Sequence, residues 1–246
     1  MKILAIDIGG SNVKFTLMTS AALEGVTVSK VPSGPEMTPK QMVAGVLEIA
    51  KDWGFDGVSI GYPGPISYGK ILMEPKNLGV GWVDFDFTKA FGKPVRLIND
   101  AAMQALGSYE GGSMLFVGLG TGMGSAMIID NIVAPMELAH LPYKKVRTFE
   151  DYVGERGLQR LGKRHWRLAV ADVVTRLKAA LVVDYVVIGG GNAKRLEELP
   201  QGAHLGDNRN AFVGGYRLWD ARTSIRNAGL AAPPPSERRR KPRRKN

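Results

Sequence analysis

The sequence predicts an α/β protein made of two domains with a cleft between them. A strand, a glycine-rich turn and a second strand follow one another within residues 3–18, and the same order returns within residues 114–129. Further strands and helices are predicted after each copy from the periodicity of the apolar residues. The repeat predicts an N-terminal α/β domain over 1–110 and a C-terminal α/β domain over 111–207, with a return helix of the first domain at about 208–220.

The individual elements are predicted from short apolar runs, which mark buried strands, and from longer apolar stripes, which mark helices. Thr38 as N-cap, Pro39 as first helical residue and Gln41 as capping-box partner mark the start of the first helix. In chain order the predicted strands are 3–6, 13–18, 57–60, 95–98, 114–117, 125–129 and 185–188, and the predicted helices are 39–53, 101–109, 149–161, 166–181 and 210–219.

The composition is that of an ordinary globular protein. Of the 246 residues, 44% are apolar and 23% charged, which excludes collagen-like and wholly disordered chains. No cysteine is present, which excludes disulfides, cysteine-bound zinc and thiol nucleophiles, and a cytoplasmic location is expected. Residues 111–129 are uncharged, but nine of them are Gly, Ser or Thr, so no membrane segment is expected. Asp7 interrupts the first apolar run, so no signal peptide is expected.

The positive charge is concentrated at the C-terminus. Residues 221–246 contain nine Lys or Arg and one acid, Glu237, so they carry +8 of the net +10 and the rest of the chain carries +2. Three consecutive prolines at 233–235 precede the basic run, which predicts a disordered basic tail over 221–246. Two roles remain open for it: a solvated end, or a contact with a polyanion that weakens steeply with salt.

Four clusters of glycine or polar residues follow apolar strands, where ligands bind in open α/β sheets. They are Asp7-Gly9-Gly10, Gly61–Gly64, Asn99-Asp100 and Gly189–Gly191. Glycines there let backbone N–H groups approach a phosphate, and residues 118–124 add a second such turn with a hydroxyl group. For any one turn a plain hairpin is the favoured interpretation, but four such turns in order are much harder to explain that way. Neither a P-loop nor a dinucleotide-binding fingerprint is present.

Together these motifs resemble those of the ROK family of sugar kinases, in the actin/hexokinase/Hsp70 superfamily. Residues 7–14 resemble the first phosphate motif, 99–101 the sugar and catalytic motif, 118–125 the second phosphate motif and 189–192 the adenosine motif. The resemblance extends from residue 2 to about 220. It implies two ribonuclease H-like domains of the actin/hexokinase type, closure of these domains on the sugar, and a homodimer.

Within the family, the chain most resembles the polyphosphate/ATP glucokinases. The Gly-Gly-Ser…Lys form of the first motif and the short body suggest this. The absence of the family's cysteine-rich zinc loop points the same way, so no zinc site is expected. The implied reaction is phosphoryl transfer from ATP or polyphosphate, with Mg²⁺, to the 6-hydroxyl of glucose.

The resemblance also implies roles for single residues. Asp100 is the general base, Asn99 holds sugar hydroxyls, Asp7 orients Mg²⁺ through water and Lys14 supports a phosphate. A helix N-cap is the alternative role of Asp100. The implied phosphate- and nucleotide-binding residues are Asp7, Gly9, Gly10, Ser11, Asn12, Lys14, Gly120, Thr121, Gly122, Gly124, Gly189, Gly190, Gly191 and Asn192.

The implied sugar-binding residues are Asn99, Asp100, Gly64, Glu137, His140 and Glu150. Glu137 and His140 belong to a Glu-x-Gly-His-like motif in which Ala139 replaces glycine, and this adds a methyl group that could disturb the local geometry. His140 is alternatively a surface histidine. Glu155 competes with Glu150 for the later glutamate of the family, and an exposed helix acid is the alternative for both.

Other functions remain open at this stage. The acceptor could be another hexose, such as mannose, or an amino sugar, because one pocket group decides such a choice. A non-catalytic sugar sensor is a second possibility, since the family includes repressors with an N-terminal helix-turn-helix. The first predicted strand begins so early in the chain that no helix-turn-helix is expected before it. Asp100 and the two glycine turns also favour catalysis, so an enzyme is the expectation.

Overall fold

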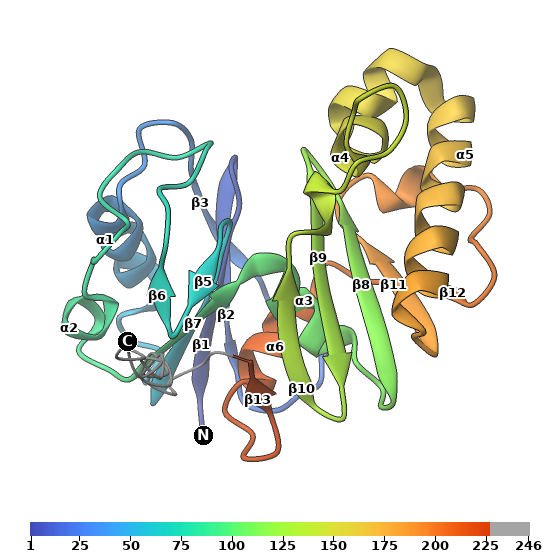
Figure 1. Cartoon of the computed structure of the whole chain (residues 1–246). Coiled ribbons are helices and arrows are strands. Elements are labelled where there is room, and N and C mark those ends of the chain that lie inside the picture. Colours follow the sequence, from blue (N-terminus) through green and yellow to red (C-terminus); the bar gives the residue numbers. More distant parts are fainter. Residues whose placement is uncertain (227–246) are drawn as a thin grey trace, which may run out of the picture.

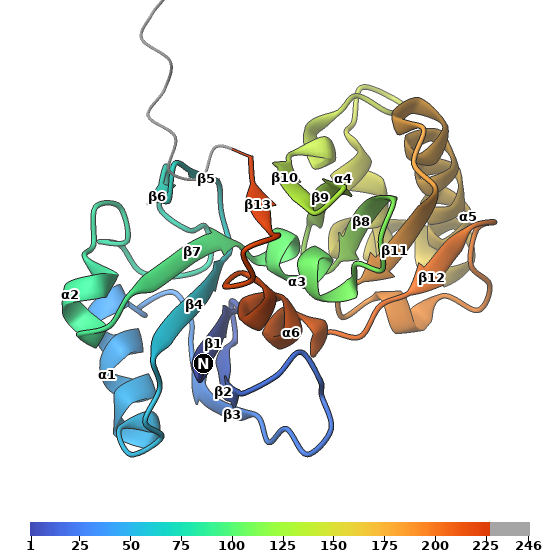
Figure 2. The ribbon, with the colours of Figure 1, turned by 90° about the horizontal axis from the view of Figure 1, so that it is seen from below.

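The computed structural model describes residues 1–226, and they form a mixed α/β fold around two large β-sheets. Helices α3 (Asp100–Ser108) and α6 (Asn210–Arg217) lie between the two sheets (Figures 1 and 2). The remaining helices cover the outer faces. Within residues 1–226, no helix combines the length and the apolar composition that crossing a bilayer requires.

The first sheet has the strand order β3-β2-β1-β4-β7. Its strands are β1 (Ile3–Ile8), β2 (Asn12–Met18), β3 (Ser29–Pro32), β4 (Gly57–Tyr62) and β7 (Val95–Asn99). β1, β4 and β7 are parallel, so their carboxyl ends meet at one edge. Residues Leu4, Ile6 and Ile8 pack toward α1 (Pro39–Ala50) and α2 (Phe87–Phe91), while Ala5 packs toward α6. Asp7 alternates with Ile6 and Ile8 and so lies on the α6 face.

The second sheet has the strand order β12-β11-β8-β9-β10-β13. Its strands are β8 (Ser113–Leu119), β9 (Met123–Ile129), β10 (Ile132–Met136), β11 (Tyr185–Gly189), β12 (Ala203–Leu205) and β13 (Ser224–Ile225). One face packs on α4 (Phe149–Val153) and α5 (Glu155–Leu181) through Leu115, Val117 and Trp166. The other face packs on α3, so this helix belongs to the core of the second sheet as well.

Helices α3 and α6 cross at two glycines. A Cβ atom added at Gly107 would lie 1.8 Å from the carbonyl oxygen of Asn210, and one added at Gly214 would lie 1.8 Å from that of Met103. The guanidinium of Arg217 donates to the carbonyls of Leu106 and Tyr109, both at 2.9 Å, and so satisfies the C-terminal end of α3. The crossing therefore joins the two sheets through backbone contact that only glycine permits.

Several predicted element boundaries are confirmed by local signals. Thr38 caps α1, and its side chain and that of Gln41 form the predicted capping box, with the Thr38 backbone N–H bound to Gln41 Oε1 at 2.9 Å. The end of this helix differs from the prediction, because α1 ends at Ala50 and not at Trp53. The two strand–turn–strand units are present as β1–β2 and β8–β9, both antiparallel hairpins.

Other boundaries differ from the sequence prediction. The helices predicted at 149–161 and 166–181 are instead α4 and the longer α5, which bends at Gly162 because this residue has φ +70° and ψ 161°. The last helix ends at Arg217 rather than 219. Residues 221–226, predicted as the start of a disordered tail, form a turn and β13, which pairs with β10. The rest of the predicted tail, 227–246, lies outside the described residues.

Some elements were not predicted at all. They are β3, the hairpin of β5 (Ile66–Ser67) and β6 (Lys70–Ile71), α2, β10, β12, β13 and the two short 3₁₀ turns at Leu138–His140 and Ala193–Arg195. Most are too short for a periodicity to be visible, and β13 exists only through pairing with β10, which lies far earlier in the chain.

Candidate active site

Asp100 is the first residue of α3, directly after the carboxyl end of β7. The N-cap is Asn99, whose side-chain oxygen accepts a hydrogen bond from the backbone N–H of Ala102 at 3.1 Å. The alternative in which Asp100 caps the helix is therefore wrong. The half-buried carboxylate of Asp100 accepts only the adjacent N–H of Ala101, at 2.8 Å, among the hydrogen bonds from other described residues.

Glycines from both sheets contact the N-terminus of α3. A Cβ atom added at Gly61, in β4, would lie 3.4 Å from the Cα of Asp100. A Cβ atom added at Gly124, in β9, would lie 2.8 Å from the Cβ of Ala101. Because neither strand carries a side chain at these points, both backbones can approach the helix. Asp100 thus lies where a strand end of the first sheet meets the glycine turn of the second.

The carboxylates of Asp7 and Asp100 interact electrostatically. Burial raises the pKa of Asp100 to about 7, and the negative charge of Asp7 is the second cause of that shift. Burial also raises the pKa of Asp7 to about 6, opposed by the positive charge of Lys14, its cross-strand partner in the β1–β2 hairpin. Asp100 is consequently poised to take up or release a proton near neutral pH.

The first glycine turn joins β1 to β2. The backbone N–H of Gly9 donates to the carbonyl of Asn12 at 3.0 Å, and Ser33 Oγ donates to the carbonyl of Gly9 at 2.6 Å. Gly10 is exposed on one side, and a Cβ atom added there would lie 3.3 Å from the Cβ of Asn77. Sequence reasoning missed Asn77, because it lies in a loop without periodicity and meets Gly10 only through the fold.

Asn99 also connects β7 to the loop after β4. Its Nδ2 donates to the carbonyl oxygen of Gly64 at 3.2 Å, while its Oδ1 caps α3. An amide has two N–H donors and two oxygen lone pairs, so one of each is left for a ligand. Asn99 and Gly64, both predicted to bind sugar, are thus held together next to Asp100.

Glu137 and His140 lie at the 3₁₀ turn after β10. Their side chains are 59% and 61% exposed, and Oε2 of Glu137 is 3.7 Å from Nε2 of His140. The charge of Glu137 also contributes to raising the pKa of Asp100, which relates this turn to the Asp100 carboxylate. Ala139 is only 2% exposed and does not have a positive φ. Its methyl group is therefore accommodated in the core without a left-handed backbone conformation.

The two competing glutamates have different surroundings. Oε2 of Glu150 accepts the backbone N–H of Met123 at 3.4 Å, and it would lie 2.3 Å from a Cβ atom added at Gly122. Glu155 instead accepts Nδ2 of Asn192 at 2.8 Å. Glu155 is thus committed to the adenosine-motif loop, whereas Glu150 lies against the second glycine turn.

Asn192 joins the second glycine turn to the loop after β11. Its backbone N–H donates to the carbonyl of Leu119 at 2.9 Å, and its Nδ2 donates to that of Gly120 at 3.2 Å. Its Oδ1 accepts Nε of Arg195 at 3.0 Å. Gly190 has φ +84°, and a Cβ atom there would lie 2.3 Å from the carbonyl oxygen of Leu119. The two loops therefore form one unit with no side chain at their closest approach.

For the phosphoryl transfer that the resemblance implies, we expect Asn192→Ala to weaken binding of the phosphoryl donor without changing that of the sugar. The variant loses the side-chain bonds to Gly120, Glu155 and Arg195 but keeps the backbone bond to Leu119, so the two loops are held together less firmly. The KM for the donor is expected to rise about tenfold, while the KM for the sugar stays within about twofold. Steady-state kinetics with each substrate varied in turn measure both, and an equal rise in both constants would contradict this role.

The remaining predicted residues also lie on these turns. The exposed ones are Gly10, Ser11, Lys14, Thr121 and Gly191; the half-buried ones are Gly9, Asn12, Gly120, Gly122, Gly124 and Gly190; and Gly189 is buried. Within residues 1–226, no group of three or more His, Asp or Glu side chains is arranged to hold a metal ion. Asp7 offers a carboxylate next to the first turn. This fits Mg²⁺, which keeps several waters and binds one or two carboxylates together with substrate phosphates.

The sequence is similar to a known protein family and to a characterised kinase. The model of the ROK family matches residues 3–135. N-acetylmannosamine kinase of Pasteurella multocida (strain Pm70) is 26% identical over 142 residues, which cover 53% of this chain and 47% of that protein. The chain thus aligns with about half the length of this curated relative.

Solved structures resemble the whole fold. The inorganic polyphosphate/ATP-glucomannokinase of Arthrobacter sp. strain KM superposes with a TM-score of 0.73 at 24% identity, over 87% of this chain and 96% of that one. A ROK family glucokinase of Streptomyces griseus, in complex with glucose and AMPPNP, gives 0.71 at 16% identity, over 89% and 99%. The fold is therefore that of the ROK sugar kinases. Because the family model covers more than half of the sequence and carries the first phosphate motif and Asp100, the chain belongs to the ROK family.

Proposed function

We propose that this ROK protein is a sugar kinase that transfers a phosphoryl group from polyphosphate or ATP to the 6-hydroxyl of glucose, with Asp100 as general base. The reaction would take place between two ribonuclease H-like domains, 1–110 with the return helix and 111–207. The observation that carries the proposal is the half-buried Asp100, with a pKa raised to about 7, beside the glycine turn of the second sheet.

In the proposed reaction, a carboxylate oxygen of Asp100 accepts the proton of the sugar hydroxyl while the hydroxyl oxygen attacks the terminal phosphorus of the donor. The new O–P bond forms as the bond to the donor's bridging oxygen breaks, and that oxygen leaves with the electron pair. Asn99 and Glu137 would hold neighbouring sugar hydroxyls. Backbone N–H groups of the two glycine turns would stabilise the negative charge on the transferred group.

The donor would lie along the second sheet, where the unit of residues 118–124 and 189–192 is exposed at Thr121 and Gly191. Mg²⁺, when bound with the donor, supplies positive charge that offsets the charge of the phosphates. Asp7 would hold its water ligands, and Lys14 would support a phosphate at the other side of the first turn. Glycine is required where the phosphates approach, because a Cβ atom would occupy that space.

The activity is expected to depend on pH through Asp100. The base must be ionised, and its pKa of about 7 means that the ionised fraction falls as pH drops below 7. We therefore expect kcat/KM to fall about tenfold per pH unit just below an apparent pKa of about 7, and more steeply below pH 6, where Asp7 is protonated as well. A pH–rate profile from pH 5 to 9 measures this, and a flat profile down to pH 5 would contradict the proposed base.

The function itself is tested by measuring glucose 6-phosphate formation with Mg²⁺, in parallel reactions with ATP and with polyphosphate. Product with either donor supports the glucokinase proposal, and the ratio of rates identifies the preferred donor. Mannose and N-acetylmannosamine form the control panel, because the relatives include a glucomannokinase and an N-acetylmannosamine kinase. Binding of a sugar with no turnover by any donor would support the sugar-sensor alternative instead. Light scattering tests the expected homodimer.

A further inference from the structure

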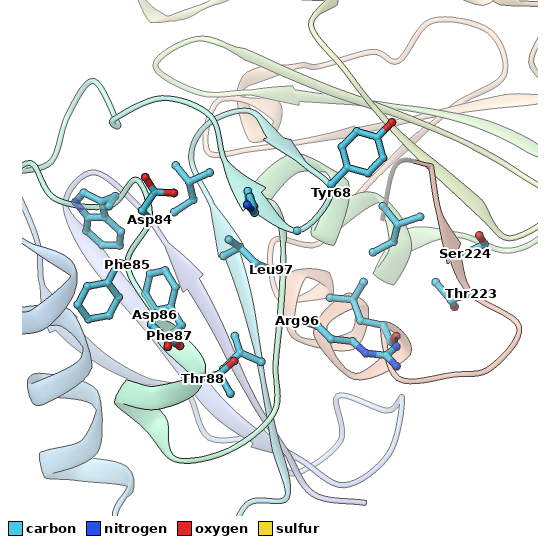
Figure 3. A pocket seen from close by; sticks show the side chains of 17 residues that line it. Tyr68, Asp84, Phe85, Asp86, Phe87, Thr88, Arg96, Leu97, Thr223 and Ser224 are labelled. Carbon is cyan, nitrogen blue, oxygen red and sulfur yellow. Dashed lines mark hydrogen bonds between the residues drawn. The ribbon is translucent and has the colours of Figure 1, made fainter. Parts of the chain in front are cut away.

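A groove of about 640 Å³ lies along the outer edge of β7 (Figure 3). Val95 to Leu97 of this edge strand form its floor, and the hairpin β5–β6 and the start of α2 form its sides. None of the glycine turns contributes to it, and neither do Asp7 and Asp100. The groove is therefore distinct from the candidate active site.

Aromatic and acidic side chains dominate one end of the groove. Phe85 is half-buried and meets the buried Phe87 edge to face, with 4.8 Å between ring centroids. Tyr68, which is 38% exposed, lies farther along the groove toward Thr223 and Ser224 (Figure 3). Asp84 and Asp86 are both exposed beside the aromatic rings. Grooves lined by aromatic rings bind proline-rich segments, which already have the extended conformation that such grooves accept.

The opposite end of the groove is formed by the last described residues of the chain. Thr223, Ser224 and Ile225 line it. The backbone N–H of Ser224 donates to the carbonyl of Asn131, in the turn before β10, at 3.1 Å, and that of Arg226 donates to the carbonyl of Val133 in β10 at 2.8 Å. Arg96 on this side is engaged elsewhere, because its guanidinium donates to the carbonyl of Leu218 and stacks 4.5 Å from the ring centroid of Trp219. The last described residues of the chain therefore lie at this end of the groove.

The residues that follow match the groove in order. Pro233–Pro235 come first along the chain, and a run containing seven Lys or Arg occupies 238–245. In Figure 3 the groove extends from Thr223 and Ser224, past Tyr68 and Leu97, to Phe85 and the two aspartates. Ten residues of extended chain, 227–236, reach about 30 Å. A segment entering at Ser224 would therefore bring prolines to the aromatic rings and basic residues to the acidic end.

We propose that residues 227–246 of this chain bind in the groove along β7, with the prolines on the aromatic rings and the basic run beside Asp84 and Asp86. Attachment at Arg226 makes this an intramolecular event, and a short tether gives effective concentrations in the millimolar range. Weak contacts are then sufficient for occupancy. This binding does not depend on the proposed kinase activity.

The full chain provides a clean test because it contains no cysteine. Thr88→Cys places a thiol on the groove wall, and Ser236→Cys places one between the prolines and the basic run. In a glutathione redox buffer, we expect this pair to form an intramolecular disulfide about tenfold faster than the pair of Lys93→Cys with Ser236→Cys. Lys93 is exposed between α2 and β7 and does not line the groove, so it is the matched control.

Two further variants of the Thr88→Cys and Ser236→Cys pair test the chemistry. Replacing Pro233, Pro234 and Pro235 by serine keeps every charge, and Asp84→Asn keeps the shape of an exposed side chain; each is expected to slow the disulfide severalfold. Circular dichroism confirms that both fold. Equal rates for the Thr88 and Lys93 pairs would overturn the proposal. Disulfides formed mainly between chains would also overturn it, because they would assign the groove to the tail of a second copy.

Discussion

Asp100→Asn is expected to lower kcat by about 10²- to 10⁴-fold while sugar affinity stays within about twofold. The amide has the shape of the carboxylate but cannot accept the hydroxyl proton. Helix α3 remains capped, because the cap is Asn99 and not Asp100. Turnover and the calorimetric Kd for glucose measure the two effects. Asp130→Asn is the matched control, since Asp130 is exposed in a surface turn, and near-normal turnover of the Asp100 variant would exclude the general-base role.

The same variant has an expected effect on stability that does not depend on the sugar. A folded-state pKa of about 7, against the ordinary 3.8, means that the native protein holds its proton at pH values where the unfolded chain has lost it. The carboxyl therefore lowers the free energy of unfolding progressively as pH rises from about 4 to about 7. Asp100→Asn should be more stable than the natural protein at pH 8, and this difference should disappear at pH 4.

Urea unfolding at pH 8 and at pH 4 measures that difference, with Asp130→Asn again as the control. A variant that is equally destabilised at both pH values would show that Asp100 is structural. This measurement needs neither donor nor sugar. It therefore tests the raised pKa of Asp100 independently of the proposed reaction.

Gly107→Ala is expected to have the largest effect on the fold, a loss of about 3 kcal/mol or more in the free energy of unfolding. The new Cβ atom would lie 1.8 Å from the backbone oxygen of Asn210. A backbone atom cannot rotate away as a side chain can, so α3 and α6 must separate. Because this crossing joins the two sheets and positions Asp100, kinase activity is expected to fall with the stability.

Gly45→Ala is the control for this prediction, because Gly45 is also inside a helix. An added Cβ atom there would lie 3.5 Å from Val31, an ordinary contact. Alanine favours the helix, so the expected change is a gain of about 0.5–1 kcal/mol. Thermal and urea unfolding measure both variants. If Gly107→Ala did not lower the free energy of unfolding relative to the natural protein, the crossing of α3 and α6 would not be rigid.

The sequence alone determined the features that depend on neighbouring residues. The two strand–turn–strand units, the capped start of α1 at Thr38 and the order of the ROK motifs are of this kind. Each rests on residues a few positions apart, where backbone propensity, capping and apolar periodicity act directly. The identity of Asp100 as the candidate base also came from its place in a motif, through the family resemblance.

The tertiary structure decided what depends on distant residues. The contact of Asn77 with Gly10, the commitment of Glu155 to Asn192, and the pairing of β13 with β10 join segments far apart in the chain. The choice of Asn99 over Asp100 as cap is local, yet it depends on the exact residue at which β7 ends. Burial next to Asp7 raises the pKa of Asp100, and burial exists only once the sheets have packed on α3. Periodicity reports which residues are buried but not against what, so these contacts are not visible in the sequence.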